Sequence, residues 1–134
     1  MLPGVIAPWN YPFYNMYNHV AAALFTGNAV VVKMSEYSAW AGVRYVALGR
    51  AVLAAAGHDP DLLQLVQGFG DTGAALVTAA DKVIFTGSPG VGKLVMKGAA
   101  NVRRVRVHAL PLLRGGTLLA WKTRRLRART SVGG

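Results

Sequence analysis

A glycine-rich loop stands between a short β-branched run at residues 82–85 and a helical pattern that follows it. Ser88 suits the N-cap of that helix, and Pro89 suits its first position, where a missing backbone N–H group costs nothing. The first turn of such a helix leaves backbone N–H groups free, and these groups attract phosphate. The residue types therefore predict a phosphate-binding loop.

Two nucleotide-binding chemistries fit this loop. The run from Gly87 to Lys93 matches the first seven positions of the P-loop pattern GxxxxGK[ST]. The eighth position departs from it, because Leu94 stands where a Ser or Thr hydroxyl would hold Mg²⁺. The other interpretation is a dinucleotide site whose pyrophosphate rests on the same helix start. An ordinary strand-to-helix turn also uses glycines and a capping serine, so the loop alone leaves all three open.

Three further polar side chains stand beside predicted strands. Asn10 lies between two prolines that fix the backbone, so its amide has a set direction and can donate to an oxygen. Lys33 and Glu36 follow a continuous apolar run at residues 29–32, which is typical of a strand buried on both faces. Ligands bind beyond the carboxyl ends of parallel strands, so this pair could meet ribose hydroxyls. A turn-forming asparagine and a solvated surface ion pair are the alternatives.

A second glycine pattern begins at Gly68. Residues 68–73 match GxGxxG between a predicted strand and a predicted helix. A lone match of this kind is weak, and the Asp or Glu expected about 20 residues later is absent.

Strands and helices alternate along the first 100 residues. The patterns predict strands at 4–7, 29–32, 62–66 and 82–85, and helices at 15–26, 37–56, 72–79 and after Pro89. This alternation predicts an α/β fold with parallel strands joined by right-handed crossovers.

The composition limits the class of protein and of site. Hydrophobic residues make up 53% of the 134 residues and charged residues 15%, which favours one domain around a buried sheet over a disordered chain. The chain has no cysteine, and its three histidines lack metal-ligand spacing, so no metal site is expected. No targeting segment is visible, and no apolar run reaches the roughly 20 residues of a membrane span. A soluble protein is expected, with the cytoplasm as the default compartment.

The net charge of +10 is concentrated at one end of the sequence. Residues 1–100 hold six bases and all five acids, whereas residues 101–134 hold nine bases and no acid. The composition thus predicts a boundary near Asn101 and an irregular basic tail over 101–134, either disordered or the product of a shifted reading frame. Such a tail could bind nucleic acid weakly and without sequence preference, in a salt-dependent way.

Four segments, GVIAPWNYPF, ALFTGNAVVVKMSE, GFGDTG and KVIFTGSPGVGK, occur in this order in residues 1–100. Together they resemble the coenzyme-binding domain of the NAD(P)-dependent aldehyde dehydrogenase superfamily. The resemblance implies an incomplete, Rossmann-like open parallel sheet with flanking helices over residues 1–100, which would bind NAD. It also implies an aldehyde substrate and a homo-oligomer that this chain is not expected to preserve. The P-loop interpretation becomes the alternative. The resemblance also implies that the diphosphate would bind at the Gly87–Ser88 turn rather than at the Gly68 pattern.

The resemblance assigns roles to individual residues. Asn10 would match the side-chain amide that helps to stabilise the oxyanion of the reaction. The coenzyme would be bound by Trp9 beside it, Lys33 and Glu36 at the adenosine ribose, Gly68 and Val91 near the adenine, and Gly87 and Ser88 at the diphosphate. Three positions depart from the usual family pattern: Met34 replaces a proline, and Pro89 and Gly90 replace Thr-Glu.

The resemblance ends where the chemical residues of the family would follow. The family continues into a Glu-Leu-Gly-Gly turn whose Glu is a general base, but here His108 falls at the Glu position and Pro111 follows. The nucleophilic cysteine is absent from this chain. The sequence therefore predicts an oxidoreductase of the aldehyde dehydrogenase type, represented by a fragment that is inactive alone. A P-loop-like nucleotide-binding protein and nucleic-acid binding through the tail are the alternatives.

Overall fold

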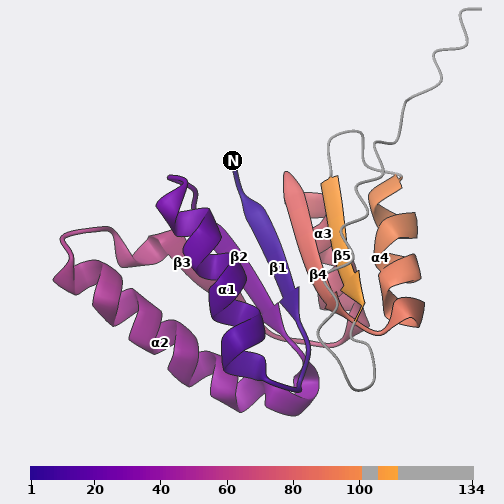
Figure 1. Cartoon of the computed structure of the whole chain (residues 1–134), viewed down its shortest axis with the longest axis horizontal. Coiled ribbons are helices and arrows are strands. Elements are labelled where there is room, and N and C mark those ends of the chain that lie inside the picture. The colour runs from indigo at the N-terminus through magenta and orange to yellow at the C-terminus, as the bar shows by residue number, and fades with distance from the viewer. Residues whose placement is uncertain (101–105, 112–134) are drawn as a thin grey trace, which may run out of the picture.

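The computed structural model of the chain describes residues 1–100 and 106–111. These residues contain one parallel sheet of five strands in the order β3-β2-β1-β4-β5 (Figure 1). The strands are β1 (Pro3–Ala7), β2 (Val30–Met34), β3 (Leu63–Val66), β4 (Lys82–Gly87) and β5 (Arg106–Pro111). The open parallel α/β sheet predicted from the sequence is confirmed.

Helices cover both faces of the sheet. They are α1 (Pro12–Phe25), α2 (Ala39–Ala55), α3 (Gly70–Ala79) and α4 (Pro89–Ala100), with short 3-10 helices η1 (Glu36–Ser38) and η2 (Pro60–Leu62). One apolar cluster joins α1 and α2 to the sheet, and includes Met16, Val46 and Val5. A second cluster joins α3 and α4 to the other face, and includes Val77 and Ala99. Two buried faces explain why the central strands read as continuous apolar runs.

The order of the strands reverses at β1. The chain first proceeds outward from β1 to β2 and β3, and then returns to the other side of β1 to form β4 and β5 (Figure 1). The segments that leave the carboxyl ends of β1 and β4 therefore diverge to opposite faces. In open α/β sheets this divergence creates the crevice where ligands bind.

Two predicted helices have different boundaries in the structure. The helix predicted at 15–26 begins at Pro12, because proline fits the first turn and Tyr11 adopts the left-handed conformation just before it. The helix predicted at 37–56 is divided into η1 and α2. Ser35 caps η1 by accepting a hydrogen bond from the Tyr37 N–H at 3.4 Å.

Strand β5 was not predicted, because its residues were assigned to the basic tail. It pairs in parallel with β4, from Lys82 beside Arg106 to Gly87 beside Pro111. An edge strand accepts a proline, since one of its sides has no ladder partner to satisfy. The sheet thus extends beyond the boundary predicted near Asn101. The predictions for 101–105 and 112–134 lie outside the described residues.

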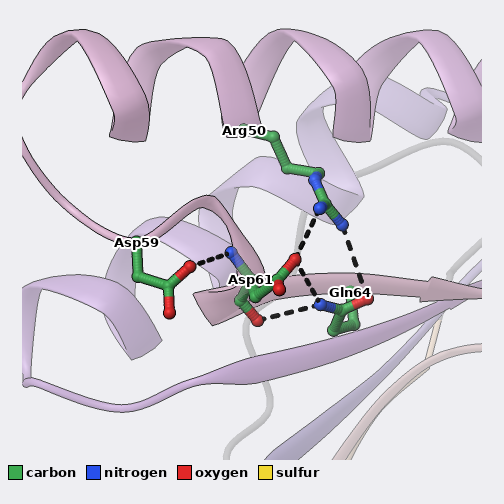
Figure 2. A network of polar contacts seen from close by, with 4 residues as sticks. All are labelled: Arg50, Asp59, Asp61 and Gln64. Atoms are coloured by element: carbon green, nitrogen blue, oxygen red, sulfur yellow. Dashed lines mark hydrogen bonds and ion pairs between the residues drawn. The ribbon is translucent and has the colours of Figure 1, made fainter.

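A polar network fixes the start of β3 against α2 (Figure 2). The Arg50 guanidinium lies 2.5 Å from Asp61 Oδ1 and donates to Gln64 Oε1 at 3.5 Å. Asp59 accepts from the Asp61 N–H at 2.8 Å, and Gln64 donates to the Asp61 carbonyl at 3.0 Å. These groups stand at the amino-terminal end of β3, on the edge of the sheet opposite to the candidate site.

Candidate coenzyme-binding site

The candidate residues from the sequence follow the carboxyl ends of four neighbouring strands. Gly68 follows β3, the Lys33–Glu36 pair stands at the end of β2, Asn10 follows β1, and Ser88 follows β4. The structure therefore brings all of these segments to one edge of the sheet. Asn10 and Ser88 flank the point where the strand order reverses.

Asn10 is held by the first turns of α1. Its carbonyl oxygen accepts a hydrogen bond from Asn15 Nδ2 at 2.9 Å, and Asn15 is itself buried. The next residue, Tyr11, has φ 47° and ψ 49°, so the chain turns sharply into the helix. The flanking prolines thus account for only part of the geometry. The Asn15 contact and the left-handed Tyr11 were not predicted, because neither has a local sequence signal.

The side-chain oxygen of Asn10 is buried without a hydrogen-bond partner among the described residues. Leaving such an atom unpaired costs free energy, and buried polar atoms of this kind are uncommon in folded proteins. The unpaired atom is an acceptor, so a ligand that donates a hydrogen bond would supply the missing contact.

Lys33 is a buried cation with an acidic neighbour. Only 6% of the residue is exposed, and its Nζ lies 3.8 Å from Glu36 Oε2. The end of β2 is tied to β1 because the Ser35 N–H donates to the Ala7 carbonyl at 3.0 Å. The buried Lys33 is therefore not solvated as a surface pair would require, although its partner Glu36 is exposed. The Glu36 side chain is 40% exposed and can still meet a ligand.

The Gly87–Ser88 turn has the predicted cap. The Val91 N–H points to Ser88 Oγ at 3.4 Å, and the Gly92 N–H donates to the Ser88 carbonyl at 3.0 Å, so α4 begins at Pro89 as predicted. Gly87 is required by packing, because a Cβ atom there would lie 2.5 Å from the Phe85 ring. Ser88 itself is exposed at the helix start.

Gly68 has a backbone role that its pattern did not reveal. Its φ of 148° favours glycine, and an added Cβ would lie 2.0 Å from Thr72 Oγ1. Glycine here permits the turn into α3. Trp9 and Val91 are 62% and 48% exposed, so both side chains are accessible to a ligand.

One polar contact at this edge was not predicted from the sequence. His19 Nε2 on α1 lies 3.3 Å from Thr86 Oγ1 at the end of β4. Burial lowers the pKa of His19, so its imidazole is neutral at pH 7. Thr86 is only 5% exposed. A lone histidine within a helical pattern gave no signal that it would reach a strand so distant in the sequence.

The described residues contain no candidate metal site and no candidate membrane span. Within residues 1–100 and 106–111, no group of His, Cys, Asp or Glu side chains is placed to hold a metal ion. Among the helices of the described part, none is long and apolar enough to cross a membrane.

Comparison with known proteins identifies the family. The model of the aldehyde dehydrogenase family matches residues 2–110, which is most of the chain. The chain belongs to the aldehyde dehydrogenase family. The match continues through most of β5, beyond the change in composition near Asn101. An aldehyde dehydrogenase of Agaricus bisporus is 38% identical over 110 residues, which cover 78% of this chain and 21% of that protein.

Solved aldehyde dehydrogenases share the fold. The NAD-dependent enzyme of Sinorhizobium meliloti has a TM-score of 0.67 and 33% identity, covering 81% of this chain and 22% of its own. A betaine aldehyde dehydrogenase mutant of Staphylococcus aureus, solved in complex with NAD⁺, has a TM-score of 0.69 and 32% identity. The match covers 81% of this chain and 22% of that one. The chain spans about a fifth of the length of the aldehyde dehydrogenases that it matches. Family membership favours the dinucleotide interpretation of the Gly87–Ser88 loop over the P-loop.

Proposed function

We propose that this chain carries the NAD-binding part of an aldehyde dehydrogenase that oxidises an aldehyde to a carboxylic acid. The observation that supports this most is the buried Lys33 joined to Glu36, on the same sheet edge as Asn10 and Ser88. When bound, NAD supplies the hydride acceptor for this oxidation. The residues of the chain bind and orient it.

Lys33 and Glu36 would hold the adenosine ribose. A carboxylate that is 40% exposed can accept hydrogen bonds from both ribose hydroxyls, and its neighbour Lys33 can donate to the same oxygens. A 2′-phosphate would bring negative charge against Glu36. The chain is therefore expected to prefer NAD to NADP.

Ser88 and the start of α4 would hold the diphosphate. The helix dipole and the Gly90 N–H would favour an anion there, since the Val91 and Gly92 N–H groups are already paired with Ser88. Trp9, Gly68 and Val91 would complete the coenzyme contacts. Pro89 lacks an N–H, so fewer donors face the diphosphate than a non-proline residue would allow.

Asn10 would act on the substrate side of the site. A preorganised amide donor stabilises negative charge as it develops on the oxygen of the reacting carbonyl, and removing one such donor typically slows a reaction about 10²–10³-fold. In this role Asn10 Nδ2 would be the donor, whereas the unpaired side-chain oxygen is an acceptor and would face a donor group instead.

Titration of the 134-residue chain with NAD and with NADP tests this function. The wild type should bind NAD more tightly, and Glu36→Gln should reduce that preference because the charge facing the 2′-phosphate is lost. Asp59→Asn is the matched control, since it removes one negative charge at the opposite edge of the sheet while keeping the cap oxygen. Tighter binding of NADP, an unchanged preference in Glu36→Gln, or binding of Mg²⁺–ATP in place of both would contradict the proposal.

A further inference from the structure

We propose that His19 is a positioning residue that bridges α1 to β4 through Thr86 and thereby sets the position of the Gly87–Ser88 turn relative to Asn10. The proposal rests on the proposed coenzyme site and adds a residue to it. His19 is not expected to touch the reacting atoms.

Helix α1 is well placed to link the two sides of the crevice. It packs in the apolar cluster with β1 and β2, through residues such as Met16 and Val20. At its start, Asn15 holds the Asn10 carbonyl at 2.9 Å. Farther along the same helix, His19 reaches Thr86 at 3.3 Å. One rigid element thus carries a contact to the loop after β1 and a contact to the end of β4.

The bridge has no counterpart at this edge of the sheet. Among the described residues, one other side-chain hydrogen bond joins the β4 segment to an earlier part of the chain: the Leu2 N–H, just before β1, donates to Oδ2 of Asp81, just before β4, at 2.7 Å. It lies at the amino-terminal edge. At the carboxyl end of β4, the His19–Thr86 contact therefore adds to the backbone ladder between β1 and β4 in holding β4 to the earlier elements.

The turn after Thr86 is held from both faces of the sheet. Successive residues of a strand point to opposite faces, so Thr86 faces α1 while Phe85 and Gly87 face the other side. His19 contacts Thr86 on the first face. The Phe85 ring closes the space above Gly87 on the second. A displacement of Thr86 would therefore move the backbone that leads directly into Ser88.

The ring of His19 suits this role in its neutral form. A neutral imidazole has one donor and one acceptor nitrogen, and a threonine hydroxyl can pair with either. Glutamine retains a donor and an acceptor at a similar reach, whereas alanine removes both. Thr86→Val keeps the shape of the side chain and removes the hydroxyl.

The experiment measures NAD affinity and backbone amide exchange at residues 87–92 in the 134-residue chain. His19→Ala and Thr86→Val should each weaken NAD binding about three- to tenfold, the effect of one net hydrogen bond. They should also speed amide exchange in the turn without NAD. His19→Gln should restore both values. His58→Ala, at an exposed loop histidine, is the control and should leave both unchanged.

A double-mutant cycle separates a bridge from general packing. If the bond acts as proposed, the double variant His19→Ala/Thr86→Val should be no weaker than either single variant. Additive losses, failure of His19→Gln to restore the values, or unchanged exchange in His19→Ala would overturn the bridge. Absence of NAD binding by the wild type would instead remove the proposed function, and the exchange measurements would still test the bridge.

Discussion

Two polar side chains, the buried Lys33 and the partly buried His19, set the chemical character of the carboxyl edge. Lys33 is buried with its Nζ 3.8 Å from the Glu36 carboxylate, and buried charged side chains are usually paired in this way. His19 is partly buried beside a hydroxyl, and desolvation lowers its pKa and so favours its neutral form. The edge therefore offers one fixed charge pair and one neutral hydrogen-bonding ring.

The neutral state of His19 predicts a pH dependence of stability. Its pKa in the folded chain lies below the usual 6.5, so between these two values the unfolded chain binds a proton that the folded chain does not. The free energy of unfolding should consequently fall as pH drops through 6.5 and recover as pH rises above it. His19→Gln lacks this group and should show a smaller fall.

Urea denaturation at pH 7.5 and at pH 5.5 measures the difference. Comparing the two proteins cancels the contributions of all other groups, which both proteins share. A fall of equal size in the wild type and in His19→Gln would show that His19 does not contribute.

At the scale of elements, α2 approaches the sheet at two glycines. A Cβ atom at Gly42 would lie 2.6 Å from Met34 Cγ, and one at Gly49 would lie 2.6 Å from Leu63 Cδ2 and 2.9 Å from Tyr17 Oη. Tyr17 cannot move away freely, because its hydroxyl donates to the Tyr45 carbonyl at 2.6 Å. The second approach is therefore the tighter constraint on α2.

Opposite effects are expected from two glycine-to-alanine changes in helices. Gly49→Ala should lower the free energy of unfolding by about 1–3 kcal/mol, because overpacking outweighs the gain in helix propensity. Gly73→Ala in α3 should raise it by about 0.5–1 kcal/mol, because nothing lies within 4 Å of the new Cβ. Urea denaturation of both variants measures this. A stabilising Gly49→Ala would show that α2 can move away from the sheet without loss.

Helices and strands could be predicted from the sequence better than contacts between residues far apart in the chain. Apolar runs and the Ser88–Pro89 cap signal were local, so four strands, the order of helices and the start of α4 could be predicted. β5 was missed because a basic composition concealed a strand that only pairing with β4 reveals. The His19–Thr86 bond joins residues 67 positions apart, and no local pattern encodes such a pairing.

At the scale of the whole molecule, the chain belongs to the family but lacks a residue type that the family's reaction needs. The chain matches the aldehyde dehydrogenase family over residues 2–110 but contains no cysteine in its 134 residues. A cysteine thiolate is the nucleophile that the family resemblance implies, and no other residue type here has comparable nucleophilicity at neutral pH.

The 134-residue chain by itself is therefore expected not to oxidise aldehydes. NADH formation from several aldehydes, followed by absorbance beside a full-length aldehyde dehydrogenase, measures this. The rate with the chain should equal the rate without protein. Sustained turnover that co-purifies with the chain would mean that another group replaces the thiolate.

The carboxyl edge of this sheet is proposed to bind NAD. Backbone amide chemical shifts of the isotope-labelled chain, recorded by NMR during titration with NAD, test it most directly. Shifts should concentrate at Asn10, Glu36, Ser88 and Val91, while Asp61 and Gln64 at the opposite edge should stay unchanged. An absence of shifts at saturating NAD, or shifts centred on the Arg50–Asp61 network, would contradict the account.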